Sequence, residues 1–304
     1  MLPIIVIVGP TGVGKTKLSV ELAKRMNAEI INADSMQVYK GLNIGTAKIK
    51  EEEKKGIAHH LFDIVDVKTL YTVYDYQKDC RKKIKEITSR GKRVILVGGT
   101  GLYIKAALFD YRFQEGTNQN SFDSFSNEEL LEKVKTYEPQ CEIHINNRRR
   151  LVRTLNKYES GEKKQTKGMT PVYPFIIVGL TTDRKLLYEK INERVDQMMN
   201  DDLLQEVKYF YDQGIRSKAV ATGIGYKELY AYLDHQQSLE DAIEQIKKNS
   251  RHYAKRQYTF FRHQMSVTWF YVNYENFSKT IEEVWNYLMT REKESCDSYL
   301  KKTE

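Results

Sequence analysis

A glycine-rich segment near the start of the chain places the strongest constraint on its fold. Residues 9–16 read Gly-Pro-Thr-Gly-Val-Gly-Lys-Thr and directly follow the apolar run Ile4–Val8. This is the P-loop pattern, in which a strand leads into a loop whose backbone N–H groups surround phosphate, and then into a helix. Lys15 would place its charge on the outer phosphate, and the hydroxyl of Thr16 would bind Mg²⁺. The expected phosphate-binding residues are Gly9, Pro10, Thr11, Gly12, Val13, Gly14, Lys15 and Thr16.

Short apolar runs alternate with helical stretches along the rest of the chain. This alternation predicts an α/β fold in which a parallel sheet carries helices on both faces. The expected strands are Ile4–Val8, Glu29–Ile31, Val94–Val97, Phe175–Leu180 and Val267–Val272.

The chain changes character between the third and fourth of these strands. Two helices are expected at Asn127–Tyr137 and Asn147–Tyr158, with polar and lysine-rich loops around them. A connection of roughly sixty residues is too long for a plain loop, so an inserted unit is expected. We therefore divide the 304 residues into a first core part (1–112), a helical insertion (113–173) and a second core part with C-terminal helices (174–304).

Charge and composition narrow the possible partners. The net charge of +8 favours an anionic partner, either phosphate groups alone or a nucleic acid. The cysteines Cys80, Cys141 and Cys296 match no zinc or disulfide spacing, which favours a reduced, cytoplasmic setting. No run of about 18 apolar residues is present, so no membrane span is expected. No feature of the chain predicts an obligate protein partner.

Two further loops follow expected strands and should meet the P-loop at the carboxyl edge of the sheet. Asp34 would bind Mg²⁺ through water or take a proton from an acceptor, although a turn is the commoner place for such an aspartate. Thr100 lies within Gly98-Gly99-Thr100-Gly101, where the glycines would let a substrate approach the backbone. The acidic residue that P-loop NTPases place at this strand end is missing, which disfavours ordinary ATP hydrolysis.

Arg194 and a histidine pair each allow two interpretations. Arg194 has no carboxylate three or four residues away on its expected helix, so it is either a phosphate clamp or a solvated arginine. His59 and His60 are adjacent and point in different directions on any regular element, which makes them a poor metal pair. A structural role is expected for the two histidines.

Two basic clusters suggest an anion larger than a nucleotide. Arg149, Arg150 and Arg153 fall within about one helical turn of the insertion. Lys255 and Arg256 lie in a stretch without acidic residues that is rich in tyrosine and phenylalanine. Basic and aromatic side chains together fit an RNA backbone with stacked bases, although each cluster alone also fits a solvated helix face.

Taken together, the motifs resemble those of the bacterial tRNA dimethylallyltransferases, which form the isopentenyl-transferase family. The matching stretches occur in the same order across most of the chain, which makes the series far more specific than the P-loop alone. They are residues 9–16, 34–39 (Asp-Ser-Met-Gln-Val-Tyr), 44–48 (Ile-Gly-Thr-Ala-Lys), 59–60, 98–103, 223–228 and 255–257.

The resemblance implies a P-loop kinase-like core whose P-loop holds dimethylallyl diphosphate with Mg²⁺. It implies that Asp34 is the general base for the adenine N6 of the adenosine 3′ to the anticodon, in tRNAs that read U-initial codons. Thr16 would hold the metal and the diphosphate, while Thr100 and Arg194 would stabilise the transition state and leaving group. The tRNA, with its target base flipped out, would contact Asp34, Ser35, Met36, Gln37, Arg149, Arg150, Arg153, Lys255 and Arg256.

The insertion departs from the family pattern at one position. The family usually carries a Gln-Arg pair and a further Arg on this helix, whereas this chain has Arg149-Arg150 with Arg153. The substitution of Gln by Arg retains binding through charge but changes the contact that position 149 can make with a base.

Three other functions are possible in principle. A small-molecule kinase would require an acidic metal ligand after Val97, which is missing. An enzyme that prenylates free adenine nucleotides would not need the two basic clusters. A nucleotide-switched RNA-binding protein would leave Asp34 and the loop 98–101 without a role. The tRNA prenyltransferase accounts for every motif and is therefore the preferred interpretation.

Overall fold

The computed structural model describes residues 2–111, 113, 122–159 and 170–300. These residues form two compact units. The core unit comprises Met1–Phe109 and Pro171–Glu304, and the insertion comprises Asp110–Thr170. The insertion boundaries expected from the sequence lie a few residues further along the chain at both ends.

The core unit is built on a six-stranded parallel sheet with strand order β3-β2-β4-β1-β5-β6. The α/β class and the parallel sheet are therefore confirmed. Each of the five expected runs contains a strand, but β3 was missed because a two-residue strand has no recognisable period. The strands are β1 (Ile4–Val8), β2 (Ala28–Asn32), β3 (His59–His60), β4 (Arg93–Val97), β5 (Phe175–Thr181) and β6 (Thr268–Tyr271).

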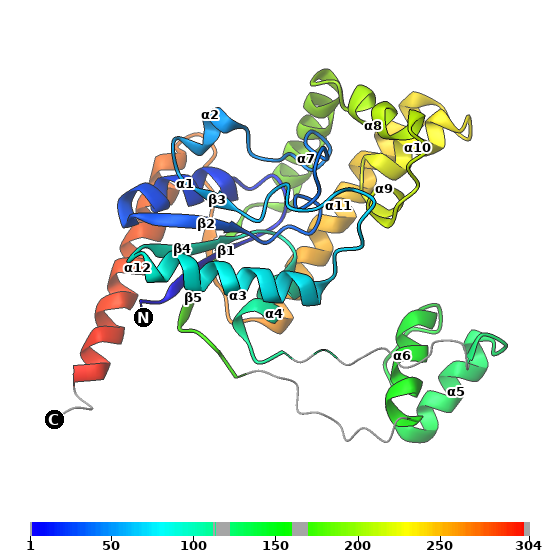
Figure 1. The fold of residues 1–304 in the computed structure, drawn as a ribbon, viewed down its shortest axis with the longest axis horizontal. Coiled ribbons are helices and arrows are strands. Elements are labelled where there is room, and N and C mark those ends of the chain that lie inside the picture. The colour runs from blue at the N-terminus through cyan, green and yellow to red at the C-terminus, as the bar shows by residue number, and fades with distance from the viewer. Residues whose placement is uncertain (1, 112, 114–121, 160–169, 301–304) are drawn as a thin grey trace. The chain divides into compact units, whose positions relative to one another are not determined.

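Helices cover both faces of the sheet (Figure 1). Alternate residues of each buried strand enter two different apolar clusters, since successive side chains of a strand point to opposite faces. The core helices are α1 (Lys15–Met26), α2 (Glu51–Lys54), α3 (Val73–Ser89), α4 (Gly101–Leu108), α7 (Arg184–Asn200), α8 (Leu203–Asp212), α9 (Lys218–Thr222), α10 (Tyr226–Leu233), α11 (Leu239–Gln264) and α12 (Phe277–Leu300).

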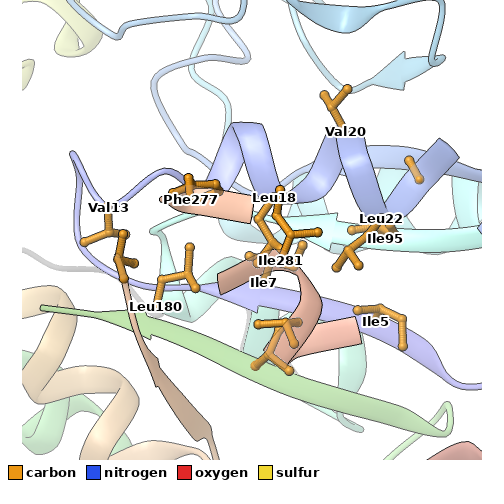
Figure 2. Packing of buried hydrophobic residues seen from close by; sticks show 14 of the residues in the cluster. Ile5, Ile7, Val13, Leu18, Val20, Leu22, Ile95, Leu180, Phe277 and Ile281 are labelled. Atoms are coloured by element: carbon orange, nitrogen blue, oxygen red, sulfur yellow. The ribbon is translucent and has the colours of Figure 1, made fainter. Parts of the chain in front are cut away.

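One face of β1 packs against α1 and α12. Figure 2 shows Ile5 and Ile7 of β1 meeting Leu18 of α1 and Ile281 of α12, all of which are buried. The opposite face, with Ile4, Val6 and Val8, packs against α3 and α4. This packing fixes the position of the loop between β1 and α1, because both of its ends are anchored in the core.

A third apolar cluster joins α7, α8, α10 and α11 to the segment that follows β2. It contains Val38, Val195, Leu203, Tyr226 and Ile246, all buried. This helical group therefore carries side chains of α7 and α11 to the loop that follows β2.

The insertion has an apolar core of its own. Its helices α5 (Asn127–Tyr137) and α6 (Arg148–Glu159) pack through Leu130, Val134, Leu151 and Leu155, with Phe122 completing the cluster. Both helices occur where the sequence predicts them. None of the helices in the described part of the chain is long and apolar enough to cross a lipid bilayer.

Candidate active site

A cavity of about 630 Å³ lies where β1, β2 and β4 end, which is the edge at which parallel α/β sheets bind ligands. Side chains of α7 and α11 and the segment before α10 complete its wall. The predicted site residues that line it are Thr11, Gly12, Gly14, Lys15, Thr16, Asp34, Ser35, Met36, Gln37, Arg194 and Arg256. Of the other predicted residues of the core, the cavity lining does not include Gly9, Pro10, Val13, Thr100 or Lys255.

The P-loop has the geometry of an anion site. Gly12 and Gly14 both have a φ of 87°, a left-handed conformation that favours glycine. Val13 between them is buried in the core and anchors the loop. The first N–H groups of α1 lack helical acceptors and carry the positive end of the helix dipole. These features favour a bound anion at the start of α1.

Two basic side chains in the cavity wall, Lys15 and Arg194, have lowered pKa values. Burial lowers the pKa of Lys15 to about 7, and the Arg194 guanidinium adds to this effect while Asp34 opposes it. Burial also lowers the pKa of Arg194, with Asp34 and Glu53 opposing. Lys15 Nζ donates a hydrogen bond to Pro10 O (2.7 Å), whereas Arg194 has no hydrogen bond or ion pair with any described residue. An anion in the cavity would relieve both positive charges.

Asp34 is held in a turn by the side chain of Asn32. Asn32 Oδ1 accepts from the Asp34 N–H (2.9 Å), and Asn32 Nδ2 donates to Asp34 O (3.1 Å). Asp34 Oδ1 accepts from the Met36 N–H at 2.9 Å. Within the described residues, Asp34 Oδ2 accepts no hydrogen bond. Asp34 therefore has the turn geometry considered above, and it also presents an open oxygen in the cavity wall.

Thr100 acts on the cavity wall through Ser35. Thr100 Oγ1 accepts from the Ser35 N–H (3.0 Å) and donates to Ser35 Oγ (3.2 Å). The hydroxyl of Thr100 thus fixes the residue next to Asp34. Its predicted contact with a leaving group would require a change in these bonds.

The glycines beside Thr100 leave room for protein atoms. A Cβ atom on Gly98 would lie 2.2 Å from Ala33 O, and one on Gly99 would lie 1.9 Å from Gln257 Nε2. Other parts of the protein occupy the space where a side chain would lie, while the backbone of Gly98 and Gly99 lines the cavity. The close approach of a substrate to this backbone therefore stays a prediction. Gly98 and Gly99 also let Ala33, which follows β2, and α11 approach the loop that follows β4.

Two residues of α11 in the cavity wall, Tyr253 and Gln257, were missed as site residues. Gln257 Oε1 accepts from the Thr11 N–H and its Nε2 donates to Gly99 O, both at 3.1 Å. Burial and the charge of Asp34 raise the pKa of Tyr253. Gln257 belongs to the motif 255–257, which was a signal, but its backbone partners cannot be found from the sequence.

The loop 43–47 forms another part of the wall and is held from two sides. Glu206 accepts three hydrogen bonds from the N–H groups of residues 43–45 (2.8–3.1 Å). Glu206 also accepts from Tyr226 OH at 2.6 Å. From the other side, Gln37 Nε2 donates to two carbonyl oxygens of this loop at 3.0 and 3.3 Å. Gln37 therefore supports the wall with its amide nitrogen, while its Oε1 makes no hydrogen bond to the described residues.

The predicted arginines of the insertion differ from their neighbour Arg148. Arg149, Arg150 and Arg153 are exposed, and none forms an ion pair with a described residue. Arg148 instead donates to Phe122 O (2.8 Å) and to three other acceptors between residues 123 and 127. Arg148 is thus part of the packing between α5 and α6.

The two basic residues predicted on α11 are both exposed. Arg256 lies over the ring of Tyr253 (5.6 Å from the centroid) and lines the cavity. Lys255 forms no ion pair with a described residue. The helix therefore carries positive charge at the cavity entrance and outside it.

His60 has the expected structural role, whereas His59 also lines the cavity. His60 Nε2 lies 2.6 Å from Glu29 Oε2, and Arg90 and Lys92 bind the same carboxylate at 2.7 and 3.0 Å. His59 Nδ1 lies 2.8 Å from Ile57 O. The side chains thus bind β3 to β2 and to the chain before β3.

The cavity residues fit Mg²⁺ only together with a phosphorylated substrate. No group of three or more His, Cys, Asp or Glu in the described residues could hold a metal ion. Mg²⁺ usually keeps several waters and binds one or two protein oxygens plus substrate phosphates. The exposed hydroxyl of Thr16 and the open oxygen of Asp34 are suitable donors of this kind.

Comparison with known proteins identifies the family. The family described as IPP transferase matches residues 37–264. The chain belongs to this family. A tRNA dimethylallyltransferase of Anoxybacillus flavithermus is 48% identical over 297 residues, which cover 94% of this chain and 96% of the relative. One from Bacillus subtilis is 48% identical over 283 residues, covering 88% and 90% of the two chains.

Solved structures of IPP transferases share the fold. The full-length tRNA isopentenylpyrophosphate transferase of Bacillus halodurans has a TM-score of 0.76 and 41% identity, over 98% of this chain and 99% of that one. A eukaryotic dimethylallyltransferase, described as acting on tRNA, has a TM-score of 0.74 and 31% identity, over 88% of this chain and 74% of that one.

Proposed function

We propose that this chain transfers the dimethylallyl group of dimethylallyl diphosphate to N6 of an adenosine in tRNA. Family membership makes the chain a prenyl-transferring enzyme, and the relatives are named for action on tRNA. The observation that carries the proposal is the set of side chains that line one cavity. It combines an open carboxylate oxygen of Asp34 with the cations Lys15 and Arg194, which lack a carboxylate partner.

The cationic part of the cavity suits the diphosphate. Lys15, Arg194 and the N–H groups at the start of α1 would bind its oxygens and stabilise the charge that develops when the allylic C–O bond breaks. Thr16 would hold Mg²⁺ with the diphosphate, and the metal would neutralise part of the leaving group's charge.

Asp34 suits the acceptor. The adenine N6 would attack the allylic carbon, a C–N bond would form, and the diphosphate would leave with the electrons of the C–O bond. Asp34 would take the proton that N6 loses, because its Oδ2 is free while Oδ1 is held by the Met36 N–H. The base must leave its stack to enter the cavity, so Ser35, Met36 and Gln37 would contact it there.

The basic clusters support a macromolecular acceptor. Arg149, Arg150 and Arg153 are exposed on the insertion, and Lys255 and Arg256 are exposed on the core unit. A free nucleotide would need no such surfaces, whereas a tRNA backbone would be bound by them. We infer that the target is the adenosine 3′ to the anticodon in tRNAs reading U-initial codons, and that the enzyme works in the cytoplasm, where such tRNAs are made.

A labelling experiment tests this function. The protein is incubated with radiolabelled dimethylallyl diphosphate, Mg²⁺ and unmodified tRNA, with AMP and ATP as alternative acceptors in parallel. Label in tRNA at the adenosine next to the anticodon is the expected result. Label in AMP or ATP would assign the chain to free-nucleotide prenylation, and label in no acceptor would contradict the proposal.

A further inference from the structure

Gln257 connects two loops of the cavity that are far apart in the sequence. Its side chain is 4% exposed and uses both ends of the amide. The oxygen accepts from the Thr11 N–H of the P-loop, and the nitrogen donates to Gly99 O in the loop after β4. The glutamine amide can accept at its oxygen and donate from its nitrogen, so one side chain binds both loops.

The second loop leads directly to Asp34. Thr100, which follows Gly99, accepts from the Ser35 N–H and donates to Ser35 Oγ. Hydrogen bonds, together with the peptide bond between Gly99 and Thr100, therefore link the P-loop through Gln257 to the residue beside Asp34. The absence of a Cβ at Gly99 is required for this path, because the atom would lie 1.9 Å from Gln257 Nε2.

We infer that Gln257 is a positioning residue for the transfer reaction. It holds the P-loop and the loop 98–101 at a fixed separation, so that the diphosphate and the carboxylate of Asp34 stay aligned with the acceptor. The inference rests on the proposed function. Reaction rates are sensitive to misplacement, and an error of 1 Å between reacting groups costs about a hundredfold.

The variant Gln257→Met tests this role, since it retains length and volume but loses both hydrogen bonds. We expect kcat to fall by about tenfold to a hundredfold. The KM for dimethylallyl diphosphate and for tRNA should change by less than about threefold, because no group that binds either substrate is removed. A thermal midpoint close to that of the wild type would exclude unfolding as the cause.

Gln264→Met is the matched control. Gln264 lies on the same helix, and its Oε1 accepts from Lys105 Nζ at 3.0 Å, away from the cavity lining. The same chemical change should there leave kcat unaltered. An equal loss of kcat in both variants would show a general effect on α11 and overturn the inference.

Gly99→Ala tests the same set of contacts by changing the residue that Gln257 Nε2 binds. The new methyl group should displace the Gln257 amide and lower kcat to a similar extent. Because both changes break one path, the double variant Gly99→Ala/Gln257→Met should be no slower than the slower single variant. Losses that multiply would overturn the inference.

Amide exchange in the P-loop separates failure of this inference from failure of the proposed function. Loss of the Gln257 oxygen should speed hydrogen exchange at the Thr11 N–H by at least about tenfold, whatever reaction the enzyme catalyses. If the wild type transfers no label to tRNA, the proposed function fails while this readout still decides the positioning role. Unchanged exchange in Gln257→Met would overturn the inference.

Discussion

The protonation of Lys15 depends on what the cavity contains. Burial and the neighbouring Arg194 lower its pKa to about 7, so near neutral pH a large share of the free protein has an uncharged Lys15. A bound diphosphate would favour the charged form and raise this pKa. The affinity for a diphosphate should therefore fall as pH rises through 7.

Calorimetry can measure this coupling. Above pH 7, binding of inorganic pyrophosphate to the wild type should take up a proton at Lys15, which makes the observed heat depend on the buffer's ionisation enthalpy. In Lys15→Arg the side chain stays charged at all these pH values, so only protons taken up by other groups remain. Equal proton uptake by the two proteins would contradict the assignment to Lys15.

Asp34 offers a second test at a single position. Asp34→Asn retains an oxygen for the Met36 N–H and therefore keeps the turn, but it cannot accept the proton from N6. Turnover should fall by about a hundredfold or more, while tRNA binding in a filter assay stays within about threefold. Full turnover would remove Asp34 as the base.

At the scale of elements, helix α6 separates two kinds of arginine. Arg148 occurs three and seven residues before the buried Leu151 and Leu155, so it lies on the packed face and donates to backbone acceptors. Arg150 lies on the exposed face. Arg150→Ala should weaken tRNA binding and lower the slope of log K against log salt by roughly 0.7–0.9.

Arg148→Ala is the contrasting variant on the same helix. It leaves buried or half-buried acceptors of the insertion without donors, and each such loss costs about 1–3 kcal/mol. Its thermal unfolding should therefore begin at a lower temperature than that of Arg150→Ala. An unchanged salt slope in Arg150→Ala would argue against α6 as an RNA contact.

The elements show what the sequence could and could not predict. The strands β1, β4 and β5 were recognisable because burial on both faces leaves a continuous apolar run. β3 was not, since it has only two residues and both, His59 and His60, are polar. The helical spacing of Arg148 relative to Leu151 was visible in the sequence and would have separated it from Arg149.

The cavity was predictable in part for a similar physical reason. The P-loop and Asp34 follow strands directly, so the sheet itself brings them together. Gln257 lines the cavity and Glu206 holds the loop 43–47, and both bind backbone atoms whose positions depend on the whole fold. Such contacts leave no pattern of residue types along the sequence.

At the scale of the whole molecule, Glu29 joins several elements and makes stability depend on pH. Burial raises the pKa of this carboxylate, but hydrogen bonds from His60, Lys92 and Arg90 outweigh burial and lower it to about 2. Because the folded pKa lies below the unfolded value of about 4.3, the stabilisation is fully present above that pH. This contribution to the free energy of unfolding, about 3 kcal/mol in total, is lost as pH falls toward 2.

Urea unfolding between pH 6 and 3 checks this contribution. The wild type should lose free energy of unfolding more steeply below pH 4.5 than Glu29→Gln, whose side chain does not titrate. Glu52→Gln, at an exposed position of α2, should follow the wild-type curve. Parallel curves for the wild type and Glu29→Gln would refute the role of Glu29.

The chain leaves and re-enters the core unit at neighbouring points. Phe109 pairs with Pro171, and the Val172 N–H donates to Leu108 O. Within the insertion, the Asp110 N–H likewise donates to Thr170 O. Because the two crossings are already adjacent, a short turn could close the core in place of the insertion at little entropic cost. The insertion is thus a modular part that could be exchanged between relatives without altering the residues that line the cavity.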